Sequence, residues 1–186
     1  MANLLNPIHY FIIYVILFQT FLIGKENEKI KFSRDIIDIA IVVEDLEETA
    51  KFYREILGLT ELNRWDAPKE PLTTLGFTDN LPFQMVTFIT GKSSKTSSIL
   101  KFISFKEIEN KSPSKDFLHS SIGLGFITIK VEDIDEQLRR LRKANIEFLG
   151  KTPTRLWDEY FAVFRDPSGN MVELVAPYKE KYNKKK

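Results

Sequence analysis

Few side chains in this 186-residue chain are suited to nucleophilic or metal chemistry. The absence of cysteine excludes thiolate nucleophiles, disulfides, iron–sulfur clusters and cysteine-ligated zinc. The only histidines are His9, inside a hydrophobic run, and His119, in the segment KDFLHSSIG, where a solvated loop position is the favoured interpretation. Chemistry is therefore expected of carboxylates. Asp38 and Glu173 are the candidates, because strand alternation places Asp38 on one face with Ala40 and Val42, and Glu173 on one face with Met171 and Val175. If both faces line one cleft, the two carboxylates share a cavity. Such a pair could bind a cation through oxygen ligands, act as acid and base with separated pKa values, or hold a basic group of a ligand.

The composition indicates one globular domain of ordinary size. Hydrophobic residues make up 43% of the chain and charged residues 28%. The formal net charge is only +1, so neither a nucleic acid nor a polyanionic partner is expected.

An internal repeat divides this domain into two modules. IAIVVEDLEE, from Ile39, and ITIKVEDIDE, from Ile127, are identical at six of ten positions. In both copies alternating apolar residues predict a strand, and an aspartate, Asp45 or Asp133, then predicts the N-cap of a helix. The first helix is predicted over 46–57, ending at Gly58, and the second ends at Asn145. The modules span about 35–105 and 124–177.

Three further strands are predicted in each module. They lie near 59–64, 84–90 and 99–105 in the first module, and near 146–149, 160–165 and 171–175 in the second. Each module is therefore βαβββ, and the fold class is α+β, with both modules forming an open, cupped mixed sheet around a cleft. The long segment 64–84 is either a lid over this cleft or plain packing.

The first 35 residues are predicted to be separate from the fold. Residues 8–24 carry no formal charge, and a hydrophobic helix in the segment 1–24 is interpreted as a secretory signal or as a short membrane anchor. A helix packed on the domain is the alternative. Residues 25–34 form a charged linker and 178–186 a basic tail. The expected location is therefore membrane-anchored or exported.

Two strings resemble a known superfamily. IVVEDLEETAKFYREILGL follows the start of the first strand, and FRDPSGNMVELVAP closes the second module. Together with the duplicated βαβββ pattern they resemble the vicinal-oxygen-chelate superfamily, over Asp35 to Pro177. This superfamily includes glyoxalase I, extradiol dioxygenases, methylmalonyl-CoA epimerase, and fosfomycin and bleomycin resistance proteins. The resemblance implies a homodimer and fixes a fold better than a reaction.

The resemblance also implies a metal position that this chain has altered. In metal-dependent relatives, ligands come from the first and last strands of each module, and these positions correspond to Asp38, Lys101, Phe126 and Glu173. Phenylalanine has no donor atom, and an ammonium repels a cation. No metal or cofactor is therefore expected, although Asp38 and Glu173 leave a weakly held divalent cation open. The alternative for Lys101 is an ion pair with Asp38 or Glu173 at the former metal position.

Three functions follow as hypotheses. The first is a metal-free domain that binds a small molecule, with Lys101, Phe126, Arg155, Trp157 and Tyr160 as candidate ligand-binding residues. The second is a lyase, an isomerase or a dioxygenase-like enzyme in which Asp38 and Glu173 are catalytic. The third is a membrane-tethered interaction module with a silent cleft.

Overall fold

The computed structural model describes residues 32–106 and 117–179. The chain divides into two units, Met1–Asp35 and Ile36–Lys186, and the fold below is that of the second. The predicted hydrophobic segment 1–24, most of the predicted linker and the tail from residue 180 lie outside the described residues. Within the described ranges, no helix is both long and apolar enough to cross a membrane.

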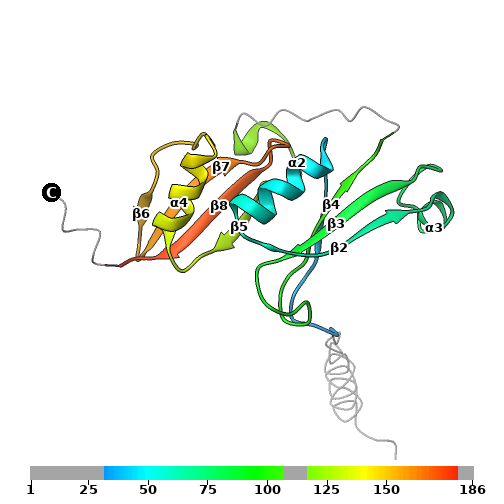
Figure 1. Cartoon of the computed structure of the whole chain (residues 1–186), viewed down its shortest axis with the longest axis horizontal. Coiled ribbons are helices and arrows are strands. Elements are labelled where there is room, and N and C mark those ends of the chain that lie inside the picture. The colour runs from blue at the N-terminus through cyan, green and yellow to red at the C-terminus, as the bar shows by residue number, and fades with distance from the viewer. Residues whose placement is uncertain (1–31, 107–116, 180–186) are drawn as a thin grey trace, which may run out of the picture. The chain divides into compact units, whose positions relative to one another are not determined.

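The described part of the second unit contains two modules of four strands each (Figure 1). The first comprises β1 (Ile39–Val42), α2 (Leu46–Lys51) continued by a π-helical turn η1 (Phe52–Ile56), β2 (Thr60–Ala67), α3 (Lys69–Thr74), β3 (Phe83–Ile89) and β4 (Leu100–Ser104). A short 3₁₀ turn, η2 (Leu118–Ser120), precedes the second, which comprises β5 (Phe126–Lys130), α4 (Ile134–Lys143), β6 (Thr154–Leu156), β7 (Glu159–Arg165) and β8 (Met171–Pro177). The duplicated βαβββ architecture is confirmed.

The two sheets have the same topology. Their strand orders are β1-β4-β3-β2 and β5-β8-β7-β6, and in each the first strand pairs in parallel with the last strand of its module. Instead of one continuous cupped sheet, the structure has two sheets, in which β1 and β5 are both edge strands.

Local sequence signals place the helices as predicted. The Asp45 side chain accepts a hydrogen bond from the Glu48 amide at 2.8 Å, and Asp133 caps α4 in the same way, so both capping predictions are confirmed. Gly58 and Asn145 adopt positive φ angles of 79° and 57° where the helices end.

Two elements differ from the prediction. The strand expected at 146–149 is reduced to one bridge between Phe148 and Phe164, and the fourth strand is β6 instead. The segment between β2 and β3, for which a lid and plain packing were both left open, contains the helix α3, whose Leu72 is buried with Ala67 and Phe83.

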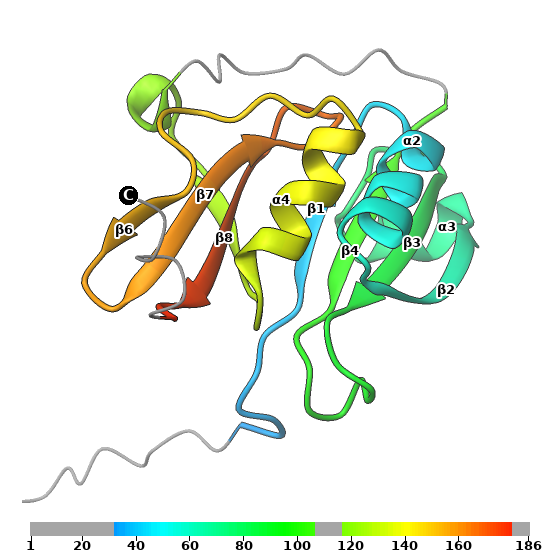
Figure 2. The ribbon, with the colours of Figure 1, turned by 60° about the vertical axis from the view of Figure 1, so that its left-hand side comes forward.

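One hydrophobic core joins the modules. Helices α2 and α4 lie on the same side of the strands, as Figure 2 shows. Alternate residues of β1, β3, β4, β5, β7 and β8 are buried with them in a single cluster. Phe52 of η1 lies 6.1 Å from Phe164 of β7, measured between ring centroids, so the cluster crosses between the modules. The remaining residues of each strand point to the opposite side, which we call the open face.

A polar contact also links the modules. The Tyr53 hydroxyl donates to Asp166 Oδ2 at 3.1 Å, and the hydroxyls of Thr49 and Ser168 lie 3.2 Å apart. Asp166 is only 3% exposed, and its Oδ1 accepts a hydrogen bond from the Asn170 amide at 2.8 Å. These contacts fix the β7–β8 loop against α2 and η1.

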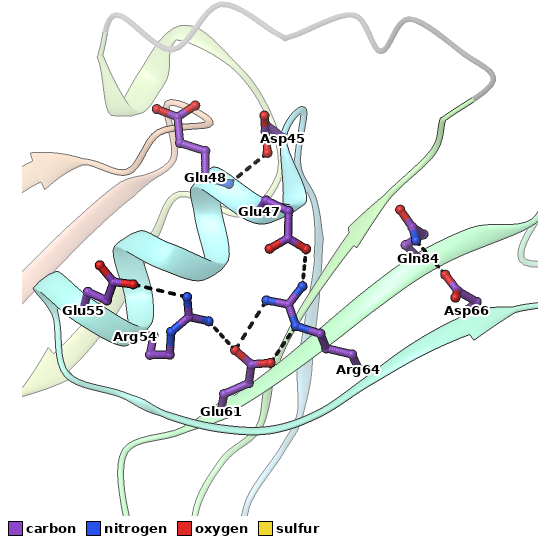
Figure 3. A network of polar contacts seen from close by, with 9 residues as sticks. All are labelled: Asp45, Glu47, Glu48, Arg54, Glu55, Glu61, Arg64, Asp66 and Gln84. Carbon is purple, nitrogen blue, oxygen red and sulfur yellow. Dashed lines mark hydrogen bonds and ion pairs between the residues drawn. The ribbon is translucent and has the colours of Figure 1, made fainter.

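A surface ion network joins the α2–η1 helix to β2 (Figure 3). Glu61 accepts from Arg64 at 2.7 Å and from Arg54 at 2.6 Å, and Arg64 also pairs with Glu47. The hydrogen bond from Arg64 is the largest cause that lowers the pKa of Glu61.

Candidate functional site

The resemblance in the sequence places Asp38, Lys101, Phe126 and Glu173 at metal-ligand positions. Lys101, Phe126 and Glu173 lie on the open faces of β4, β5 and β8, and Asp38 directly precedes β1. In register, β1 residue Ala40 is opposite Lys101, and β5 residue Thr128 is opposite Glu173. Lys101 and Glu173 are therefore equivalent positions of the two modules, which agrees with the repeat in the sequence.

In the first module, Lys101 forms an ion pair with Asp38. The Nζ–Oδ2 distance is 3.4 Å, and the side chains are 35% and 18% exposed, respectively. This is one of the two pairings that the sequence left open for Lys101. An ammonium beside the carboxylate lowers its capacity to bind a cation, because the two cations would repel each other.

A polar row extends from this ion pair across the first sheet. Thr87 is in register with Lys101, and Asn63 is in register with Thr87. The Thr87 hydroxyl donates to Asn63 Oδ1 at 2.5 Å. Sequence reasoning missed both residues, because only the strand register brings them beside Lys101.

An apolar row lies next to the polar one. Val42, Ile103, Met85 and Trp65 are in register across the four strands. Helix α3 covers the end of this face, because Met85 and Ile103 pack against the small hydrophobic cluster that contains Leu72 of α3. The first open face therefore has a polar row beside an apolar row.

In the second module, Glu173 has a different partner. The Thr128 hydroxyl donates to Glu173 Oε2 at 2.7 Å. Phe126, two residues before Thr128 on the same face, is 45% exposed. The structure thus gives each predicted carboxylate its own partner: Lys101 for Asp38 and Thr128 for Glu173.

The other three predicted ligand-binding residues do not lie together on the open face. Tyr160 is buried in the core on the helix side, and Arg155 is opposite it in register. The Arg155 guanidinium lies 3.7 Å from the ring centroid of Tyr178. Trp157 is exposed in the β6–β7 turn and packs edge-on against Phe161, an open-face residue.

His119 takes no part in these clusters. It lies in η2, is exposed, and stacks on Phe117 with ring centroids 5.6 Å apart.

A pocket of about 220 Å³ lies at the end of the second open face. We call it the end pocket. Its floor includes Phe126, Met171 and Arg165, which are in register across β5, β8 and β7. Its lining is completed by Val42, the β7–β8 residues Gly169 and Asn170, and residues Phe117, Leu118, Ser121 to Gly125 and Ile127. The Thr128–Glu173 pair lies on the same face, two residues further along the strands than Phe126 and Met171, which is about 7 Å away.

Sequence reasoning selected Phe126 but missed the rest of the end pocket. The loop string DPSGN indicated a turn, and nothing in it signalled that Gly169 and Asn170 border a hollow. Arg165 is the last residue of β7, and only the observed burial of its neighbour Phe164 places Arg165 on the open face.

The residues at the metal-ligand positions do not fit a divalent cation. Phe126 has no donor atom. Lys101 is itself a cation, and it forms an ion pair with Asp38. Within 32–106 and 117–179, no cluster of three or more histidine, cysteine, aspartate or glutamate side chains is arranged to hold a metal.

Comparisons with known proteins agree with this architecture. A glyoxalase family protein from Bacillus cereus is 21% identical, with a TM-score of 0.68, over 82% of this chain and 99% of that one. Trypanothione-dependent glyoxalase I from Leishmania major is 24% identical, with a TM-score of 0.55, over 82% and 92%. A glyoxalase/dioxygenase from Nostoc punctiforme is 20% identical, with a TM-score of 0.57, over 82% and 99%. At these identities the likeness shows the fold.

No curated protein matches the chain. The Glyoxalase/Bleomycin resistance protein/Dioxygenase superfamily does match, over residues 36–174. That match spans most of the sequence and both modules, and it confirms the resemblance seen in the two sequence strings: the chain belongs to this superfamily.

Proposed function

We propose that this protein binds a small molecule on its open face and does so without the superfamily's divalent-metal site. The observation that carries the proposal is the ion pair between Lys101 and Asp38, since it puts a cation of the protein itself at a ligand position. Phe126, at the equivalent of Asp38 in the other module, offers a ring in place of a donor atom.

Two features support ligand binding. The first open face carries a polar row beside an apolar row, so it can accept a molecule with a polar and an apolar side. The end pocket adds a hollow lined by aliphatic and aromatic side chains together with a few polar groups, which is the usual character of small-molecule sites.

The test has two arms on the full-length chain, purified without chelators or a histidine tag. Elemental analysis is expected to find no stoichiometric metal, and Mg²⁺, Mn²⁺, Zn²⁺, Ni²⁺ and Fe²⁺ are expected to leave the melting temperature unchanged. A library of small organic molecules is expected to contain compounds that raise it, because a ligand that binds only the native state stabilises that state. A stoichiometric metal would contradict the metal-free site, and a library without a single stabilising compound would contradict ligand binding.

A lyase or isomerase is the second candidate, and one contact favours it. The hydrogen bond from Thr128 holds the Glu173 carboxyl group on the open face, in a position for proton transfer to or from a ligand. Under this alternative, Glu173→Gln abolishes turnover of a carbonyl substrate while the far-ultraviolet circular dichroism spectrum stays the same. Equal turnover by the variant would exclude Glu173 as the catalytic base.

The homodimer implied by the superfamily is also proposed. Val42, Trp65, Phe126 and Leu156 expose large apolar surfaces on the open faces, and such surfaces favour association. Sedimentation equilibrium is expected to give twice the chain mass of 21.7 kDa, and the monomer mass would contradict it. The membrane-tethered module stays a prediction, because the segment on which it depends lies outside the described residues.

A further inference from the structure

One charged side chain, that of Arg165, lies among the described residues that line the end pocket. Of the described residues that line it, Arg165 alone carries a formal charge, and the others are apolar, glycine, serine or asparagine. The neighbouring acid, Asp166, is turned into the core, where it accepts the hydrogen bond of Tyr53 and is 3% exposed. Within 32–106 and 117–179, the lining of the end pocket therefore contributes one cation and no carboxylate.

The Arg165 guanidinium is held in a defined place. Its Nη1 donates to the Gly169 carbonyl at 3.0 Å, and Gly169 belongs to the β7–β8 loop that is fixed by Asp166. A guanidinium is planar and has five N–H donors, and this fork matches the two oxygens of a carboxylate. Holding the fork in advance lowers the entropy lost when an anion binds.

The remaining walls limit the rest of the ligand. Phe126 and Met171 share the register row of Arg165, and Val42, Leu118 and Ile122 complete an apolar lining. The volume of about 220 Å³ is below the range of about 300–1,000 Å³ that is usual for pockets of drug-sized ligands, so the end pocket suits a compact body of one ring or a short branched chain.

From this geometry we propose that the end pocket takes a small organic carboxylate, with its anionic group on Arg165 and its apolar body against Phe126 and Met171. The inference rests on the proposed small-molecule function and names the ligand class for it. A carboxylate bound in the end pocket also lies about two strand residues from the Thr128–Glu173 pair. Glu173 is therefore positioned to repel a second negative charge on the ligand.

The experiment compares three probes of nearly the same shape and different charge: benzoate, benzyl alcohol and benzylammonium. Each is titrated into the full-length chain in a buffer without carboxylate or phosphate, and binding is followed by isothermal titration calorimetry. Benzoate is expected to bind at least about tenfold more tightly than either other probe, which is the usual effect of a hydrogen bond to a charged group.

Three variants locate the binding site. Arg165→Gln is expected to weaken benzoate binding by about tenfold or more, and Arg165→Lys, which keeps the charge and loses the fork, is expected to give a smaller loss. Arg139→Gln is the matched control, because Arg139 lies on α4 and pairs there with Glu136 at 2.7 Å. It is expected to bind benzoate as the unmodified chain does.

The outcomes separate this inference from the proposed function. Equal binding of all three probes, or benzoate binding that Arg165→Gln leaves unchanged, overturns the carboxylate assignment while small-molecule binding stands. If no probe binds but other library compounds stabilise the chain, the ligand class is wrong and the function survives. If neither the probes nor the library bind, both are wrong. Should Arg165→Gln fail to fold, the probe comparison on the unmodified chain and Arg165→Lys still decide the matter.

Discussion

The hydrogen bond between Tyr53 and Asp166 joins residues 113 positions apart, and we expect its loss to weaken the contact between the modules. Tyr53→Phe removes one hydroxyl and leaves the ring contacts with Phe102 and Phe88 in place. A hydrogen bond to a charged group contributes about 1.5–3 kcal/mol. Asp166 keeps its bonds from Asn170, so we expect the free energy of unfolding to fall by about 2 kcal/mol. For a domain of this size that corresponds to a melting temperature lower by about 4–8 °C.

The assay is urea unfolding at pH 7 combined with differential scanning calorimetry. A double-mutant cycle with Asp166→Asn isolates the pair, and the coupling between the two changes is expected to reach about 0.5–3 kcal/mol. Additive effects of the two substitutions, or a melting temperature that Tyr53→Phe leaves unchanged, would refute the assignment of this bond as an energetic link between the modules.

The same pair predicts a pH dependence with a defined sign. Burial is the main cause that raises the pKa of Tyr53 well above its ordinary value of 10.0, and Asp166 raises it further. Because the folded-state pKa is above the unfolded one, this contribution to stability is complete below pH 10 and is lost as the pH rises above it. The stability difference between the unmodified chain and Tyr53→Phe is therefore expected to shrink in alkaline solution, and a gap that stays constant to the highest pH at which the chain folds would contradict this.

Three further predictions test the site and its support. The double variant Lys101→Glu and Phe126→His places donor groups at all four ligand positions. Calorimetry is therefore expected to show that the variant binds Ni²⁺ or Zn²⁺ and that the unmodified chain does not. No binding by the variant would mean that the four positions do not converge on one site. Leu72→Ala is expected to lower the free energy of unfolding by about 2 kcal/mol or more, measured in urea, because Leu72 is buried between α3 and the first sheet; a neutral result would mean that α3 is loosely packed. Glu61→Gln is expected to cost at most about 1 kcal/mol at pH 7, since the two arginines that pair with Glu61 are 41% and 38% exposed and solvent screens these ion pairs. Because the pKa of Glu61 is lowered in the fold, that difference is present above its unfolded pKa and disappears as the pH falls through the folded one, and a difference that grows in acid would contradict the network.

What the sequence determined by itself is local or repeated. The strands with alternating apolar residues, the aspartate caps at Asp45 and Asp133, and the turn at Gly58 were all predictable, because each depends on residues a few positions apart. The duplicated βαβββ pattern, together with the strings IVVEDLEETAKFYREILGL and FRDPSGNMVELVAP, also indicated the superfamily.

Tertiary structure decided which residues meet. In β7, Tyr160, Ala162 and Phe164 alternate with Phe161 and Val163, and both sets are apolar, so the sequence could not tell which face is buried. The structure turns Tyr160, and Arg155 with it, to the helix side, whereas the sequence had suggested both as ligand-binding residues of the cleft.

The site itself depends on strand register and on long-range packing. The partners Lys101 for Asp38, Thr128 for Glu173 and Asp166 for Tyr53 are each more than 40 positions away in sequence. A carboxylate in a strand has several possible partners, and only the pairing of β1 with β4 and of β5 with β8 selects one. The end pocket exists for the same reason, because its floor is one register row across three strands and its cover comes from separate loops.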